Sequence, residues 1–283
     1  MRCDLHVHTI HSGMCTIPVL NRFCRESYNN PEEVYAILKH RGMDLVTITD
    51  HDSIDAAESL RHHPDFFLSE EVSALTPDAN DLHIGVYGIT ERQHTGLQAR
   101  RNDFFALLAY IREEDLLFSV NHVFSSLTGR RSHDDFSFFA ELFPAVETLN
   151  GQIPHALNRS AAAFAEQWRK SVVGGSDAHN LDGLGRTYTE VRGVRTAQEF
   201  LKDLRAGRGS VHGESGRYWK LTRAIYDIGC SMGLEKSWTL VLAPLLFAVP
   251  LFTMANLVKE HLFNYRWSRR VQQLGARAGV EVA

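Results

Sequence analysis

The sequence predicts an α/β protein built on a largely parallel sheet or barrel. Short apolar runs alternate with helix-like stretches from Met1 to about Val211, and no internal repeat is evident. Polar residues also stand repeatedly where an apolar run ends. Strands that alternate with helices form largely parallel sheets, and ligand-binding groups gather at the ends of their strands.

The first two elements illustrate this pattern. In CDLHVHT (residues 3–9) the odd positions up to 7 are apolar and the even positions are Asp or His, which predicts a strand. A helix follows, because Asn30 can cap it, Pro31 suits its first turn and Gly42 ends it.

The other elements are expected from similar runs. Further strands are predicted in DLVTITDHD (44–52), FFLSEEVSA (66–74), DLHIGVYGI (81–89), LLFSVNHV (116–123), AVETLNG (145–151), SVVGGSDAHN (171–180) and TYTEV (187–191). Further helices are predicted at about 103–114, 161–169 and 197–206.

The bulk composition narrows the functional classes. The 283 residues, 44% of them hydrophobic, suffice for one large domain or two smaller ones. A net charge of -4 argues against a dedicated nucleic-acid binder, so no stable nucleic-acid partner is expected. The four cysteines form no C-x-x-C pair and the start has no secretory pattern, which indicates a cytoplasmic catalytic part.

The C-terminal segment has a different character. Residues 238–258 carry no charge and are long enough to cross a bilayer, but Pro244, Pro250 and Asn256 weaken that interpretation. Arginines between 266 and 270 would also lie on the unfavoured side after a single crossing. The segment is therefore expected to form an interfacial or re-entrant membrane hairpin, or a buried helix of an oligomer.

Histidines and carboxylates at the strand ends carry the functional signal. The pair His6 and His8 lies on one face of a strand, as two metal ligands require, although H-x-H alone is a weak signal. In chain order, DLHVHT, ITDHD, EEVS, a histidine-bearing strand, NH and GSDAH each offer an imidazole or a carboxylate. This series resembles the PHP family (polymerase and histidinol phosphatase) of metal-dependent phosphoesterases over roughly Arg2 to Ser210.

The resemblance implies a distorted (β/α)7 barrel with up to three metals in the cleft at the strand ends. It assigns His6, His8, Glu71 and Asp177 to a first metal. It assigns a bridging Glu71, His83 and His122 to a second metal, and His51 and His179 to a third. Mixed imidazole and carboxylate ligands suit two to three divalent ions of Zn, Mn or Fe.

One position departs from the family pattern. The resemblance leads us to expect an Asp or His shortly after H-x-H-T as the last ligand of the third metal, but Gly13 and Met14 occupy those slots. His11 and Cys15 are nearby alternatives, and neither stands at the usual spacing. The third site is therefore expected to be weak, empty or completed by substrate.

The expected chemistry follows from a dinuclear core. Two ions about 3.5–4 Å apart can bind a phosphoryl group, so the attacking group is expected to be a metal-bound hydroxide. Without a third metal, His179 or His51 is expected to transfer the proton. Asp4, Asp50 and Asp52 adjoin ligands and are expected to orient their imidazoles.

Three further residues are candidates for binding the substrate. The guanidinium of Arg186 can form a fork of hydrogen bonds with a phosphate. Glu147 and Asn150 lie at a strand end, where the resemblance suggests that they line the pocket.

The predicted function is hydrolysis of a phosphate mono- or diester by a unit at 1–213, followed by a helical, hydrophobic segment at 214–283. The expected substrate is small and phosphorylated, and candidates include a nucleotide or an oligonucleotide end. Two alternatives stay open: a metal-dependent amidohydrolase-like enzyme that cleaves C–N bonds, and a degenerate metal-binding module at a membrane. In each case the chain is expected in the cytoplasm, with 238–258 offering membrane association.

Overall fold

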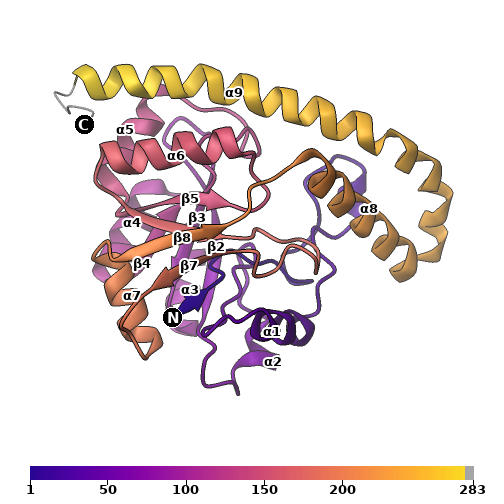
Figure 1. Cartoon of the computed structure of the whole chain (residues 1–283), viewed down its shortest axis with the longest axis horizontal. Helices are drawn as coiled ribbons and strands as arrows, with labels where there is room; N and C mark the ends of the chain where they lie inside the picture. Colours follow the sequence, from indigo (N-terminus) through magenta and orange to yellow (C-terminus); the bar gives the residue numbers. More distant parts are fainter. Residues whose placement is uncertain (278–283) are drawn as a thin grey trace.

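The computed structural model describes residues 1–277 and shows a mixed α/β fold (Figure 1). Its strands are β1 (Arg2–Cys3), β2 (Ser69–Leu75), β3 (Asp81–Tyr87), β4 (Leu117–Val120), β5 (Ala145–Asn150), β6 (Ser171–Gly175), β7 (Thr187–Val191) and β8 (Gly209–Gly213). Its α-helices are α1 (Pro31–His40), α2 (Ala57–Leu60), α3 (Glu91–Gln98), α4 (Phe104–Glu113), α5 (His133–Leu142), α6 (His155–Gln167), α7 (Ala197–Arg205), α8 (Tyr218–Glu235) and α9 (Val249–Arg277). Two 3-10 helices, η1 (Leu20–Arg22) and η2 (Ser237–Ala248), complete the fold.

The strands form two sheets, and only part of the larger one is parallel. Its order is β2-β3-β4-β5-β6, in which β2, β3 and β4 are antiparallel neighbours and β4, β5 and β6 are parallel neighbours. The smaller sheet, β1-β7-β8, is antiparallel throughout. The prediction of a largely parallel sheet is therefore wrong for half of the larger sheet, and the strands described within 1–277 form no closed barrel.

The segment at 44–52, expected to be a strand, forms no regular ladder. Threonine hydroxyls in this segment form some of the hydrogen bonds with neighbouring backbone that a regular strand would form through its own backbone. Thr49 Oγ1 accepts from the Val7 N–H at 2.9 Å, and Thr47 Oγ1 donates to the Phe67 carbonyl at 2.8 Å. The segment still lies beside its neighbours, through isolated bridges such as the one between His51 and Glu71.

The first predicted helix is confirmed by its cap. The Asn30 side chain accepts a hydrogen bond from the Glu32 N–H at 3.0 Å, Pro31 is the first helical residue, and Gly42 adopts a φ of 80° just after the end. The first predicted strand is regular only at Arg2–Cys3, so His6 and His8 lie in irregular backbone beyond it.

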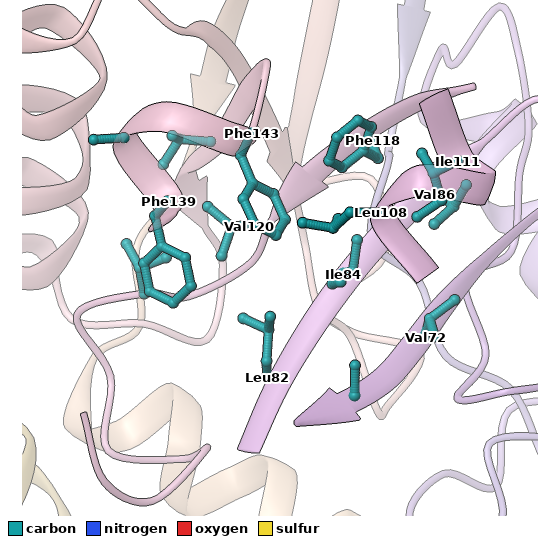
Figure 2. Packing of buried hydrophobic residues seen from close by; sticks show 14 of the residues in the cluster. Val72, Leu82, Ile84, Val86, Leu108, Ile111, Phe118, Val120, Phe139 and Phe143 are labelled. Atoms are coloured by element: carbon teal, nitrogen blue, oxygen red, sulfur yellow. The ribbon is translucent and has the colours of Figure 1, made fainter. Parts of the chain in front are cut away.

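The main hydrophobic core lies between the five-stranded sheet and the helices that cover it. Figure 2 shows Phe118, Phe139 and Phe143 packed there against aliphatic side chains of β2, β3 and α4. The long α9 runs over α6 (Figure 1) and adds Trp267, only 4% exposed, to this core. The later half of α9 is thus an integral part of the folded body.

Candidate metal centre

Separate segments bring the predicted metal ligands to one place. Two of these ligands follow β1, and one follows the segment at 44–50. Two more lie in the antiparallel strands β2 and β3. The last three follow parallel strands, one after β4 and two after β6. The structure gathers all eight: His6, His8, His51, Glu71, His83, His122, Asp177 and His179.

The first group of donors surrounds the side chains of His6 and His8. Their Nε2 atoms are 3.0 Å apart, and His6 Nε2 lies 3.2 Å from Glu71 Oε2. Asp177 Oδ1 lies 3.3 Å from His8 Nε2 and 3.5 Å from His6 Nε2. Donors bound at about 2.1 Å in a tetrahedron would be about 3.4 Å apart, so these four side chains have the spacing of a metal cage.

Glu71 joins this group to a second one. Its Oε2 faces the first group, whereas its Oε1 lies 3.4 Å from His122 Nε2 and 3.5 Å from His83 Nδ1. Asn121, which sequence reasoning did not single out, donates to the same Oε1 at 2.8 Å and fixes the orientation of the carboxylate. The two oxygens of one carboxylate are therefore aimed at two different donor sets.

A third group brings together two predicted ligands and a carboxylate that the sequence did not reveal. Glu26 places Oε2 at 3.5 Å from His51 Nε2 and Oε1 at 3.5 Å from His179 Nε2. An acidic side chain thus stands where the family pattern calls for one, although Gly13 and Met14 cannot supply it.

The loop after His8 explains how Glu26 reaches this place. Met14 pairs with Arg25 in an antiparallel bridge, and the Glu26 N–H donates to the Gly13 carbonyl at 3.1 Å. The chain doubles back so that Glu26 lies beside Gly13, the position where the ligand was expected. No local pattern marks this pairing, since η1 lies between the two paired stretches.

The donor set fits divalent metal ions. His51 Nδ1, His83 Nδ1 and His179 Nε2 are buried atoms for which residues 1–277 offer no hydrogen-bond partner. Each lies 3.4–3.5 Å from a carboxylate oxygen. A buried polar atom left without a partner costs about 1–3 kcal/mol, and a cation between the donors would remove that cost.

The electrostatics of the site keep its carboxylates ionised. Burial alone would raise the pKa of Glu71 and of Asp177, but the surrounding imidazoles outweigh it and hold both pKa values well below the usual range. The same balance, with His179 and His51 as neighbours, lowers the pKa of Glu26 to about 2. Burial lowers the pKa of His51 to about 4, which leaves its ring neutral and free to bind a cation near pH 7.

Glu147 and Asn150 lie beneath the ligands rather than in the pocket wall. Glu147 Oε1 lies 2.6 Å from His6 Nδ1, and its Oε2 accepts from the His122 N–H at 3.0 Å. Asn150 Nδ2 lies 3.0 Å from both Glu147 Oε2 and Asp177 Oδ2. Both residues are buried, and their contacts orient metal ligands instead of lining the cavity as expected.

Two of the three neighbouring aspartates act on backbone rather than on imidazoles. Asp4 accepts from the Ser176 N–H at 2.7 Å and the Gly185 N–H at 2.8 Å. Asp52 accepts from the Ser73 N–H at 2.9 Å and pairs with Arg101. The structure thus gives both a different role from the expected one.

Asp50 reaches an imidazole indirectly. Its Oδ1 accepts from the Ser12 hydroxyl at 2.6 Å, and Ser12 Oγ lies 2.8 Å from His8 Nδ1. Ser12, another residue that the sequence did not reveal, therefore connects Asp50 to a metal ligand.

Two of the seven non-glycine residues that have a positive φ in the described chain are predicted ligands. His122 has a φ of 32° and Asp177 has a φ of 51°. Both lie in the left-handed region, which residues other than Gly rarely adopt. The His122 N–H is held by Glu147, and the Asp177 N–H donates to the His6 carbonyl at 2.7 Å. These bonds stabilise conformations that aim both side chains at the shared site.

The site opens into a cavity of about 530 Å³. Arg186 does not reach it: its guanidinium donates to Asp182 and pairs with Glu214 at 3.6 Å. Within the described chain, no Lys or Arg lines this cavity. The expectation that Arg186 binds the substrate is therefore wrong for this cavity.

Comparisons with known proteins agree with this arrangement. A family model described as PHP-associated matches residues 155–208. No curated protein sequence matches the chain. Among solved structures, PsfC from Pseudomonas syringae PB-5123 is similar with a TM-score of 0.59 and 18% identity, over 82% of this chain and 97% of that chain.

A second solved structure is the lesion-specific endonuclease PfuEndoQ from Pyrococcus furiosus. It is similar with a TM-score of 0.50 and 18% identity, over 75% of this chain and 58% of that chain. At this identity both likenesses show a shared fold. The PHP-associated family model adds a sequence match that is confined to residues 155–208.

Proposed function

We propose that this chain is a metal-dependent phosphoesterase that hydrolyses a phosphate mono- or diester. One observation carries the proposal: Glu71 aims its two oxygens at two donor sets, and both sets border one cavity. We divide the chain into a catalytic unit at residues 1–213, which holds this centre, and a C-terminal segment at 214–283. An endonuclease with the same fold acts on phosphodiesters, which supports this reaction class.

The side chains of the centre suit this reaction. Divalent ions bound here would hold the phosphoryl oxygens, acidify water and neutralise the charge on the leaving oxygen. Glu147 holds the His6 ring in place, and Asn121 does the same for Glu71. Hydrolysis adds water across the P–O ester bond, so the oxygen that leaves must gain a proton.

Of the two histidines expected to transfer that proton, His179 is our candidate for supplying it, because the lowered pKa of His51 leaves that ring neutral near pH 7. His51 and His179 both line the cavity and both face Glu26. Contact with Glu26 and Asp177 outweighs the effect of burial and raises the pKa of His179 to about 9, so its ring holds a proton near pH 7 when no metal is bound. With a third ion in place, both rings would be ligands and water would carry the proton.

The test compares two neighbouring glutamates of β2. Glu71→Gln removes the negative charge from the centre, whereas Glu70→Gln changes a buried carboxyl that contacts His94 and Gln98 on the other face. Both proteins would be assayed for bound metal and for hydrolysis of 4-nitrophenyl phosphate and bis-(4-nitrophenyl) phosphate. We expect Glu71→Gln to lose at least about 100-fold in kcat/KM and Glu70→Gln to retain activity.

The same panel separates the alternatives. Turnover of amide substrates without turnover of phosphate esters would replace the proposal by C–N hydrolysis. Metal bound to the wild type, with no turnover on either class, would indicate a binding module instead.

A further inference from the structure

The cavity above the metal centre has two unlike walls. The metal ligands form one wall, and the opposite wall is largely apolar and comes from α8 and α9. Its apolar members are Leu221, Ala224, Ile225, Ile228, Phe252 and Leu257, and α9 adds the polar Thr253, Asn256 and Glu260. An occupant that fills this space must present an anionic or polar group to one wall and hydrocarbon to the other.

The apolar wall continues onto the molecular surface. Phe252 lines the cavity and is also 55% exposed, and its neighbour Leu251 is exposed as well. We call residues 237–258 the apolar hairpin, because this stretch of η2 and early α9 contains no charged residue. Its exposed large apolar side chains are Trp238, Leu240, Val241, Leu245, Phe247, Leu251, Phe252, Met254 and Val258. Exposed apolar side chains gathered in one segment in this number mark an interaction site.

The attachments of the apolar hairpin restrict how it can meet a membrane. By length and composition, 237–274 is apolar enough to cross a bilayer. Just before the hairpin, however, Lys236 Nζ donates to the Phe23 carbonyl at 3.0 Å. Just after it, Glu260, 2% exposed, accepts from the Ser126 hydroxyl at 2.6 Å. A single crossing would put these two anchors on opposite sides, although both bind the same folded body (Figure 1).

We propose that the apolar hairpin inserts into one leaflet of a membrane and that the cavity receives a lipid phosphate ester from it. This inference rests on the proposed phosphoesterase function. The phosphate lies at the metal centre, and the hydrocarbon chain lies along α8 and α9 and leaves past Phe252. Lys236 and Lys259 bracket the uncharged segment; Lys236 is held by the Phe23 carbonyl and Glu235, so the exposed Lys259 is the ammonium group offered to the lipid headgroups.

A lipid explains the cavity better than the other candidates do. A nucleotide or an oligonucleotide end carries further phosphates or polar bases, yet the described lining offers no Lys or Arg and presents aliphatic side chains instead. A second copy of the chain could cover the exposed face, but it would leave the apolar wall inside the cavity unexplained.

The membrane contact is tested by flotation with vesicles of phosphatidylcholine and phosphatidylglycerol. The double variant Leu245→Ser/Phe247→Ser removes two side chains that are 61% and 88% exposed and lie outside the cavity. The control is Phe105→Ser, because Phe105 is similarly exposed, at 56%, but belongs to α4. We expect the double variant to bind vesicles at least about tenfold more weakly, with unchanged hydrolysis of 4-nitrophenyl phosphate, and the control to bind as wild type does.

The substrate class is tested with a series of alkyl phosphates from ethyl to octyl. For the wild type, kcat/KM should rise at least about tenfold along the series, and Phe252→Ala should flatten that rise without abolishing turnover of ethyl phosphate. Glu71→Gln should remove activity on every member.

The outcomes separate this inference from the proposed function. Turnover independent of chain length, or a wild type that does not float with vesicles, overturns the lipid inference and leaves the phosphoesterase standing. Vesicle binding without turnover of any phosphate ester refutes the phosphoesterase. A wild-type dimer that the double variant dissociates, without vesicle binding, would assign the hairpin to self-association.

Discussion

Replacing Glu26 tests whether a distant carboxylate completes the third metal site. Glu26 brings one oxygen to each of His51 and His179, at 3.5 Å in both cases. In Glu26→Ala this site falls from three donors to two imidazoles. Losing an outer partner of a ligand typically weakens metal binding about 10–100-fold, so losing a direct ligand should cost at least about 100-fold, or about 2.7 kcal/mol. The two groups that share Glu71 should keep their ions.

The assay is equilibrium dialysis against limiting Zn²⁺ or Mn²⁺, followed by metal analysis of the retained protein. Glu26→Ala should bind one ion fewer per chain than the wild type, while Glu33→Gln, which alters an exposed carboxylate of α1, should bind the full number. An unchanged stoichiometry and affinity in Glu26→Ala would refute the reasoning. Loss of every ion would show that Glu26 supports the whole centre rather than one site.

Three further predictions concern the scaffold. Burial raises the pKa of Asp4 from 3.8 to about 6, so its contribution to stability is present below pH 3.8 and is lost as pH rises through 6. In chemical denaturation of the metal-free protein, the free energy of unfolding of the wild type should fall by about 3 kcal/mol relative to that of Asp4→Asn over that window; equal pH slopes would contradict this. In Gly175→Ala the new Cβ would clash with the backbone nitrogen of His6, so metal analysis should show weakened binding by the first group, and normal binding would disprove the close approach. Trp267→Ala should lower the free energy of unfolding by about 3–5 kcal/mol, and a change under 1 kcal/mol would show that α9 is not part of the core.

The ligands that sequence could predict are those that stand beside short-range motifs. His6 and His8 are two residues apart, as are Asp177 and His179, and each pair directly follows an apolar run. Glu26 belongs to no such motif. Its position depends on a loop that folds back on Gly13. Pairing within an irregular loop has no periodicity, so a single sequence does not reveal it.

The predictions of substrate-binding residues were wrong for a different reason. Arg186 was chosen for its chemistry and its proximity in sequence to His179, but Asp182, four residues earlier, binds its guanidinium. Glu147 was expected at a strand end, but it lies within β5 and its side chain turns toward His6. Proximity along the chain sets distance only roughly, and the direction of a side chain depends on partners that the sequence does not name.

The antiparallel start of the larger sheet could have been predicted. Only the stretch from Thr76 to Asn80 separates β2 from β3, and it contains Pro77 and Asp78. A parallel pair needs a crossover of about a dozen residues, so this turn permits only a hairpin. The irregular backbone at 44–52 was harder to foresee, because Thr47 and Thr49 favour a strand by propensity while their hydroxyls satisfy neighbouring backbone.

The order in which the cavity is assembled during synthesis follows from where its two walls lie in the chain. The eight predicted ligands and Glu26 all precede residue 180, whereas the apolar wall begins at Leu221. On the ribosome the metal-binding side chains can therefore come together, and bind ions, before α8 and α9 emerge and cover them. During that interval the centre faces bulk water, and under the lipid proposal selectivity for an amphiphilic substrate would arise only when the last helix docks through Glu260 and Trp267.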